Sequence, residues 1–240
     1  MVLLQENQEE SSSKPKYMQN VKCKKCKRAT EKLFLKGDRC FSPKCSLTRA
    51  SFAAKGKKSG PKKFRKKVSE YGMQLMGKQR VKFGYGLKEE QFVRYVKEAE
   101  KSLGGTSSST LFGAMERRLD NVVYRMGLTD GRRASRQMVN HGHITVNGRK
   151  VDVPSFRVKV GDKVAIRKES SDKGFFKDID LKLKKHTTPI WIGLDKDKKE
   201  ATILAMPDVD SEDGMLSRLN QIIELFSFLR HNSRIKKCLG

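Results

Sequence analysis

The fold is decided by residues 117–150, which read RRLDNVVYRMGLTDGRRASRQMVNHGHITVNGRK. Around the start of this stretch, apolar residues recur every three or four positions from Leu111 to Met126, as on one face of a helix. Gly127 follows as a suitable C-terminal cap. We therefore predict one continuous helix over residues 111–126, with its polar side chains on the other faces.

The second half of the stretch predicts another helix and then a tight hairpin. Thr129 or Asp130 can cap this helix at its start, and Gly142 ends it. Asn147-Gly148 suits a two-residue hairpin turn, because both central residues of that turn need a positive φ. The predicted product is a helical pair that leads into antiparallel strands, which is an α+β arrangement.

Further strands and a helix are predicted downstream. Residues 156–166 alternate apolar and polar positions around a Gly-Asp turn, which predicts a second hairpin. Residues 189–195 and 200–205 predict another strand pair, and residues 212–229 predict an amphipathic helix. Trp191 is interpreted as a packing residue of this part, with stacking on RNA as the alternative.

Arginines dominate the polar faces of the two predicted helices. Guanidinium groups bind phosphate oxygens bidentately, whereas a solvated surface without a partner is the alternative. Removing Arg132 and Arg136 together is then expected to weaken RNA binding without unfolding the protein. The candidate RNA-binding residues of this stretch are Arg117, Arg118, Arg125, Arg132, Arg136, Gln137, Asn147, Gly148, Arg149 and Lys150.

Residues 62–77 and 87–102 predict two more helices, joined by a connector over residues 78–86. Basic and aromatic residues are interleaved in this connector, a combination that holds phosphates and stacks on bases. Packing between helices is the alternative for the two aromatic residues, Phe83 and Tyr85. The candidate RNA-binding residues of this part are Lys66, Lys67, Arg80, Lys82 and Tyr85.

The charge of the chain supports a polyanionic partner. The formal net charge is +26, and residues 1–170 hold 40 Lys and Arg against 16 Asp and Glu. Residues 171–240 hold 13 against 11, so the excess is concentrated. A membrane is not an expected partner, because no apolar run approaches the ~20 residues of a spanning helix.

Four of the five cysteines fall in one short segment with the spacing C-x2-C-x13-C-x4-C. Such clustering favours a metal site in a reducing compartment over a disulfide framework. Four thiolates suit a closed tetrahedral Zn2+ site, with an iron–sulfur cluster as the second choice and metal-free thiols as the remaining alternative. The candidate ligands are Cys23, Cys26, Cys40 and Cys45.

These patterns together predict an α+β protein: a helical N-terminal region with a four-cysteine zinc knuckle, and an inserted RNA-binding module of helices and hairpins. The predicted parts are a disordered extension (1–20), the zinc knuckle (21–49), a basic helical region (50–110), the RNA-binding module (111–168), and a C-terminal strand pair with an amphipathic helix (169–240).

The residues quoted above resemble a known family. RLDNVVYRMG, RRASRQMV and the pattern H-x-x-I-x-V-N-G-R-x-V-x-x-P-S look like the RNA-binding module named after small-subunit ribosomal protein four. KLFLKGDRCFSPKC (residues 32–45) and residues 68–99 resemble the rest of that ribosomal protein family, in its bacterial or organellar form. The likeness covers about residues 21–205, in the order of segments that the family has.

This resemblance implies a structural constituent of the small ribosomal subunit. Its expected properties are direct binding to small-subunit ribosomal RNA, nucleation of the 5′ domain during assembly, and a contribution to decoding accuracy near the messenger entry path. The implied protein partners are small-subunit ribosomal proteins three and five, without a small-molecule substrate. The resemblance also implies a cytoplasmic ribosomal location and one structural zinc ion held by the four clustered cysteines.

Two other classes of function are weighed against this interpretation. An RNA-modifying enzyme that carries the module would need a catalytic constellation, and the sequence has no P-loop, Rossmann glycine pattern, G-x-S-x-G or H-E-x-x-H motif. We therefore expect no catalysis. A free regulator could bind messenger RNA through the same surface, and the family order of the segments is what argues against it.

Overall fold

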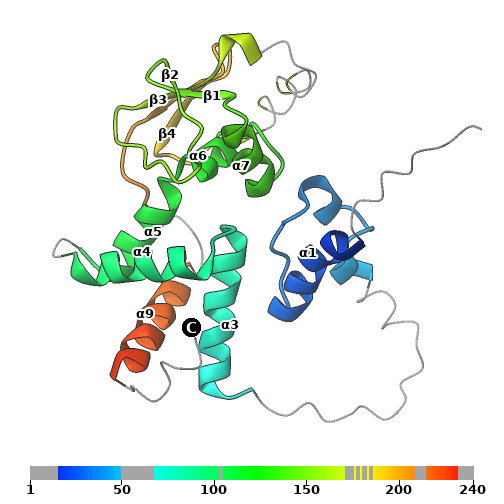
Figure 1. Ribbon diagram of the computed structural model, residues 1–240, viewed down its shortest axis with the longest axis vertical. Helices are drawn as coiled ribbons and strands as arrows, with labels where there is room; N and C mark the ends of the chain where they lie inside the picture. Colours follow the sequence, from blue (N-terminus) through cyan, green and yellow to red (C-terminus); the bar gives the residue numbers. More distant parts are fainter. Residues whose placement is uncertain are drawn as a thin grey trace, which may run out of the picture.

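The computed structural model describes residues 16–49, 68–102, 105–170, 186–208 and 215–231, with the single positions 176, 179 and 183. Lys66 and Lys67 lie outside this part, as do residues 1–15 of the predicted extension. Figure 1 shows three groups of elements: a layer of helices, a sheet with two helices against it, and an N-terminal segment beside them.

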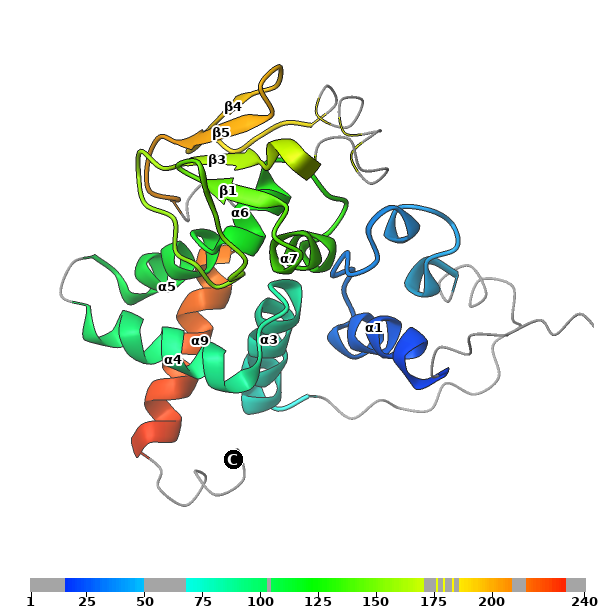
Figure 2. The ribbon, with the colours of Figure 1, turned by 45° about the horizontal axis from the view of Figure 1, so that its top comes forward.

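The helical layer encloses one apolar core, to which Phe92, Val96 and Leu111 contribute almost completely buried side chains. The C-terminal helix of this layer packs against helices from the N-terminal half, as Figure 2 shows. It confirms the amphipathic helix predicted from the sequence. The four helices are α3 (Glu70–Gly84), α4 (Glu89–Lys101), α5 (Ser107–Glu116) and α9 (Met215–His231).

The second unit is a five-stranded antiparallel sheet with strand order β2-β1-β3-β5-β4. Two helices pack on it, and their shared core includes Leu119, Val139, Ile144 and Val164. Trp191 is buried in this core, which confirms its packing role. The elements are α6 (Leu119–Arg125), α7 (Arg132–Asn140), β1 (Ile144–Val146), β2 (Arg149–Lys150), β3 (Lys163–Ile166), β4 (Ile192–Asp195) and β5 (Glu200–Ile203).

The single helix predicted over residues 111–126 is wrong, because the segment forms two helices. α5 ends at Glu116, and Arg118 has an extended backbone (φ −69°, ψ 135°) before α6 begins. The N–H of Leu119 donates to the carbonyl oxygen of Phe156 and so leaves the α5 ladder. Apolar spacing continues unchanged across the break, so periodicity alone could not reveal it.

The connector predicted over residues 78–86 is also wrong, because α3 continues to Gly84. Lys78 and Lys82 lie one turn apart on α3, and both donate to the carboxylate of Glu89 at the start of α4. The two lysines are 1% and 9% exposed. Both ammonium groups stay inside the helix contact because each donates to an oxygen of the shared carboxylate, which offsets part of their charge.

The hairpin turn is confirmed, since Asn147 and Gly148 have φ values of 50° and 78°. The second predicted hairpin, over residues 156–166, forms only in part. Its second half is β3, which pairs with β1 and β5 rather than with residues 158–160. The C-terminal part predicted over residues 169–240 is therefore divided: β4 and β5 extend the sheet, whereas α9 joins the helical layer.

The cysteine knuckle (residues 21–49) lies beside α7, as Figures 1 and 2 both show. Gly37 has a φ of 58°, and a Cβ added there would stand 2.8 Å from the Cβ of Asp130. Glycine adopts this φ without strain, and a side chain at this position would collide with Asp130. Arg80 ties the knuckle to α3, because its Nε donates to the carbonyl oxygen of Ala29 at 2.9 Å. The helical elements of this segment include α1 (Lys16–Ala29) and η1 (Gly37–Cys40), and residues 46–49 are helical as well.

Candidate nucleic-acid interface

The junction between the helical layer and the sheet unit is built around one buried carboxylate. Glu116 is fully buried and accepts hydrogen bonds from Arg125 Nε at 2.9 Å and Nη2 at 2.8 Å. Tyr85 Oη donates to it at 2.5 Å, and Asn121 Nδ2 donates at 2.8 Å. Each carboxylate oxygen therefore has two donors, which a buried charge requires.

The electrostatics of this group keep Glu116 charged. Burial alone would raise the pKa of Glu116, but the charges of Arg125 and Arg132 and the hydrogen bonds from Arg125 and Tyr85 outweigh it and lower the pKa. Arg132 also lies over the rings of Tyr85 and Tyr124, 4.5 and 4.7 Å from their centroids. We call Glu116, Tyr85, Asn121, Arg125 and Arg132 the Glu116 cluster.

A second ion pair lies next to this cluster. Arg118 is 1% exposed, and its Nε and Nη2 donate to the two carboxylate oxygens of Asp120 at 3.0 and 2.8 Å. Its Nη1 donates to Tyr95 Oη at 2.7 Å. Arg136 reaches the same carboxylate at 3.2 Å and also donates to the carbonyl oxygen of Gly86 at 2.8 Å. The contacts of Arg118 and Arg136 with Asp120, Tyr95 and Gly86 therefore hold α6 and α7 against the helical layer.

The contacts correct three sequence predictions. Arg118 was expected on the surface, but it is buried with its acidic partner. Tyr85 is 5% exposed, so the structure favours the packing alternative for this residue, and Lys82 is occupied by Glu89. We remove Arg118, Tyr85 and Lys82 from the candidate interface. A basic or aromatic residue at a helix boundary looks the same in sequence whether its partner is a carboxylate or a phosphate.

Other predicted residues lie between interior and surface. The side chains of Arg125, Arg132 and Arg136 are 20%, 24% and 33% exposed, and each also makes an internal contact. Removal of Arg132 and Arg136 should therefore cost some stability, and the expectation that the protein stays folded without them remains a prediction. Arg117 is half-buried, with Nε 3.4 Å from the carbonyl oxygen of Gly113 that accepts its hydrogen bond.

A different set of predicted residues is exposed. Gln137 on α7 and Asn147, Gly148, Arg149 and Lys150 on the hairpin all lie at the surface. The neighbouring Arg133 on α7 is exposed as well but is absent from the predicted site. The signal was available, since residues four apart on a helix share a face. Further exposed cations of the sheet unit outside the predicted site include Lys159, Lys163 and Lys168.

The hairpin and α7 form one continuous surface. A Cβ added at Gly142, just after α7, would stand 3.0 Å from Lys150 Nζ, so this lysine lies against the end of that helix. Asn147 uses its side chain to fix the turn: Nδ2 donates to Asp162 Oδ1 at 2.8 Å, and Oδ1 accepts from the Lys163 N–H at 2.9 Å. We call Arg133, Gln137, Arg149 and Lys150 the exposed basic surface.

The four clustered cysteines line one cavity of about 20 Å³ in the knuckle. Their sulfurs accept hydrogen bonds from the backbone, as when the Lys36 N–H donates to Cys40 Sγ at 3.4 Å. Burial raises the pKa of Cys26, and the negative charges of the other three thiols raise it further against a backbone hydrogen bond from Leu33. The thiols are thus close enough to repel one another when ionised.

Cys23 and Cys45 lose their protons more readily than an ordinary thiol, because the pKa of each is lowered. Burial opposes ionisation of Cys23, but hydrogen bonds from Ser46 and Lys36 and the charges of Lys36 and Arg39 lower its pKa. Burial likewise opposes ionisation of Cys45, and hydrogen bonds from Thr48 and Leu47 lower its pKa. A divalent cation would relieve the repulsion between such thiolates, so the donor set fits zinc.

The cavity is not a preformed coordination shell. Within the described ranges, no group of three or more His, Cys, Asp or Glu side chains is placed to hold a metal ion. The zinc ion and the alternative iron–sulfur cluster therefore stay predictions. Among the described helices, none is long and apolar enough to cross a bilayer.

Two protein-family models match this chain. The exposed cations on the α+β unit define the class first: a basic sheet-and-helix module whose surface suits a polyanion. The S4 domain model matches residues 117–164, and the model of the ribosomal protein S4/S9 N-terminal domain matches residues 18–116. The boundary between the two models falls at the break between α5 and α6, where the Glu116 cluster joins the two units.

Curated relatives give the family itself. The chain is 43% identical over 205 residues to the small ribosomal subunit proteins uS4 of Pelotomaculum thermopropionicum and of Desulforamulus reducens. It is 41% identical over 205 residues to that of Syntrophomonas wolfei, and each alignment covers 85% of this chain and 96% of the relative. The chain belongs to the uS4 family of small ribosomal subunit proteins.

Proposed function

We propose that the protein is a structural constituent of the small ribosomal subunit and binds small-subunit ribosomal RNA directly. One observation carries the proposal: the cations form two sets. Those around Glu116 and Asp120 are paired with acids inside the molecule. Arg133, Arg149 and Lys150 are exposed and form no ion pair with any residue that the structure describes. A fixed array of unneutralised cations suits a polyanion.

The mechanism is electrostatic. Phosphate groups that contact the exposed basic surface release counterions, so the logarithm of the affinity falls by roughly one unit per contact for each tenfold rise in salt. The exposed edges of Arg117, Arg125, Arg132 and Arg136 extend this surface toward the helical layer. Because the Glu116 cluster fixes α6 and α7, the spacing of the cations is fixed too, and RNA shape can be discriminated.

Family membership supports the finer parts of the proposal. The protein would bind the 5′ domain of the ribosomal RNA early and nucleate its assembly. It would lie near the messenger entry path, contact small-subunit proteins three and five, and contribute to decoding accuracy. As a member of this family the protein is part of the ribosome in the cytoplasm, with a structural rather than catalytic role.

We also propose that the four cysteines hold one structural Zn2+ ion, with an iron–sulfur cluster as the second candidate. The ion would supply charge compensation for four thiolates and folding energy for a segment with few buried apolar residues. Elemental analysis of the purified chain should find about one zinc per molecule. Replacement of Cys40 by Ser should abolish that stoichiometry, whereas a visible iron–sulfur absorption spectrum would favour the second candidate.

Filter binding across a salt series tests the main proposal. The ligand is the 5′ domain of small-subunit ribosomal RNA, with tRNA as the competitor. We expect tight binding that survives excess tRNA at moderate salt. Equal affinity for both RNAs, with a steep loss in salt, would contradict the proposal and favour a nonspecific basic protein or a free regulator.

A further inference from the structure

Two stacked aromatic rings lie on the surface of the cysteine knuckle. Phe34 and Phe41 have ring centroids 4.9 Å apart and planes inclined by 27°. Phe34 is 39% exposed and Phe41 is 73% exposed. Full burial of a phenylalanine contributes about 1.5–3 kcal/mol to stability, and Phe41 forgoes most of that contribution. Packing in the core of this chain therefore does not explain why the two rings lie at the surface.

The backbone holds the pair in an unusual conformation. Phe34 has a φ of 48°, in the left-handed region, where a bulky side chain is a conformational outlier. Such a residue costs about 1–3 kcal/mol and persists only where its surroundings fix it. Here the Gly37 N–H donates to the Phe34 carbonyl oxygen, and the same oxygen lies 3.6 Å from the position of a Cβ on Gly131. The backbone of Phe34 is thus fixed against the residue before α7.

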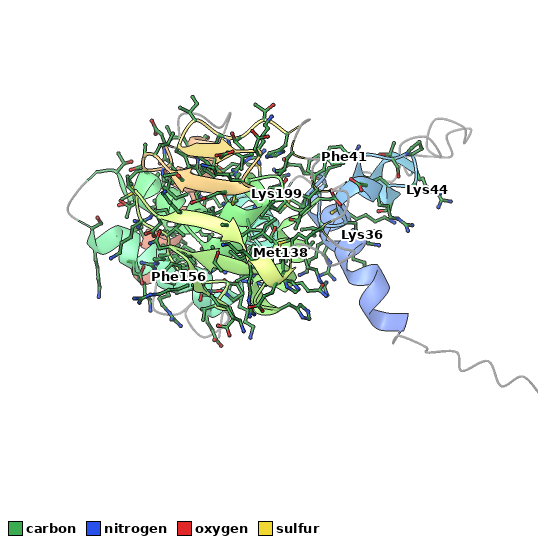
Figure 3. All side chains as sticks on the ribbon, turned by 90° about the horizontal axis from the view of Figure 1, so that it is seen from above. Lys36, Phe41, Lys44, Met138, Phe156 and Lys199 are labelled. Carbon is green, nitrogen blue, oxygen red and sulfur yellow. The ribbon has the colours of Figure 1, made fainter. Side chains whose placement is uncertain are left out.

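Positive charge flanks the rings. Figure 3 shows Lys36, Phe41 and Lys44 together on the knuckle, beside the body that carries Met138. Asp38 is the one acidic residue among residues 32–45. The basic residues of this segment are Lys32, Lys36, Arg39 and Lys44, of which all but Lys36 are exposed.

We propose that Phe34 and Phe41 form a stacking platform for an unpaired base of RNA, with the flanking cations on its neighbouring phosphates. This inference rests on the proposed RNA-binding function and adds a site to it. A nucleotide offers the aromatic face of its base and the negative charge of its phosphate. The two rings match the base, and the flanking cations match the phosphate. The knuckle that carries the rings packs on Asp130, three residues before Arg133 of the exposed basic surface.

A pair of conservative variants tests the platform in the full-length, zinc-loaded protein. Phe41→Leu keeps an apolar side chain against Phe34 but removes the ring, whereas Phe41→Tyr keeps the ring. Stacking on one base is worth ~1–3 kcal/mol, so Phe41→Leu should weaken RNA binding about 5- to 150-fold. Phe41→Tyr should stay close to the wild type. The salt dependence of Phe41→Leu should be unchanged, whereas Arg133→Ala should reduce the slope by about one.

Ultraviolet cross-linking of the wild-type complex gives a readout that does not depend on the folding of a variant. Mass spectrometry should find a nucleotide adduct on the peptide that carries Phe34 and Phe41. RNA affinity of Phe41→Leu equal to that of the wild type, or cross-links that all lie outside this peptide, would overturn the proposal. A protein would then be the occupant to test on this surface.

The experiment separates this inference from the proposed function. Both variants are also measured with a short single-stranded oligoadenylate, which contains bases but no ribosomal structure. Loss of oligoadenylate binding by Phe41→Leu, in a chain that does not prefer ribosomal RNA over tRNA, would support the platform while contradicting the proposed function. A chain that prefers ribosomal RNA but whose Phe41→Leu variant binds normally would give the opposite outcome.

Discussion

The Glu116 cluster and the exposed basic surface use the same residue type for opposite purposes. In the cluster, Arg125 shares a fully buried carboxylate with Tyr85 and Asn121. On the surface, Arg133 and Arg149 are exposed and have no acidic partner among the described residues. The two regions draw on neighbouring parts of the sequence. The Glu116 cluster fixes the junction of two units, whereas the exposed basic surface is available to phosphate.

The difference shows that abundance of arginine does not by itself mark a binding surface. A buried ion pair contributes little relative to apolar packing, but removal of one partner leaves an uncompensated charge. An exposed cation contributes almost nothing to stability and gains its energy only from a ligand. Substitutions in the Glu116 cluster should therefore change stability, whereas substitutions on the exposed basic surface should change RNA affinity.

Glu116→Gln should have the largest effect, on stability. The substitution keeps the shape of the side chain but leaves Arg125 and Arg132 without their buried negative charge. Loss of one partner from a buried ion pair costs about 3–5 kcal/mol. Urea denaturation followed by circular dichroism measures the change. Glu98→Gln is the matched control, because Glu98 also pairs with an arginine but is 44% exposed.

A loss of less than about 1 kcal/mol in Glu116→Gln would contradict this interpretation, since exposed pairs already account for that much. The charge of Glu116 would then not be what holds the junction.

Acidification should weaken the cluster in the wild type. The pKa of Glu116 is lowered in the folded state, so its contribution to stability is complete above the ordinary pKa of a glutamate. That contribution is lost as the pH falls through the lower folded-state pKa. The free energy of unfolding should therefore decrease with falling pH in this acidic window, and the decrease should be smaller in Glu116→Gln. Identical pH profiles would exclude Glu116 as a source of acid sensitivity.

Local patterns in the sequence predicted much of the fold. The φ values at Asn147 and Gly148 are those that the hairpin dipeptide requires. The strand pair β4–β5 and helix α9 also lie where apolar periodicity placed them. Contacts between distant segments decided the rest. The break at Arg118 depends on the carbonyl of Phe156, 37 positions beyond the Leu119 N–H that it binds, and on a side chain that turns inward to Asp120.

The candidate site was less predictable for the same reason. Charge and residue type identified the module as RNA-binding, and the family comparisons support that conclusion. They could not separate Arg118 from Arg133, because the partner of each is set by tertiary structure. Likewise, the basic and aromatic pattern around Lys82 and Tyr85 has the composition of an RNA contact, although both residues are interior.

Arg149→Ala with Lys150→Ala should reveal the opposite property of the exposed surface. Two lost phosphate contacts should reduce the salt slope by about two and weaken ribosomal RNA binding at least about tenfold, or about 1.4 kcal/mol. Stability should stay within about 0.5 kcal/mol of the wild type, because both side chains are exposed. Filter binding and urea denaturation of the same preparation measure both. Unchanged affinity would remove the hairpin from the RNA surface.

The smallest effect is expected for the ion pair between Glu98 and Arg157, which joins α4 to the loop before β3 on the outside of the molecule. Their side chains are 44% and 40% exposed, so water screens most of the attraction. A double-mutant cycle with Glu98→Gln and Arg157→Gln should give a coupling of about 0.2–1 kcal/mol that disappears at high salt. The same cycle with Glu116→Gln and Arg125→Gln should give a larger coupling that salt hardly changes, because the first carboxylate is buried. Equal couplings with equal salt dependence would mean that the two regions differ in exposure but not in energy, and the division of the cations into two sets would lose its physical basis.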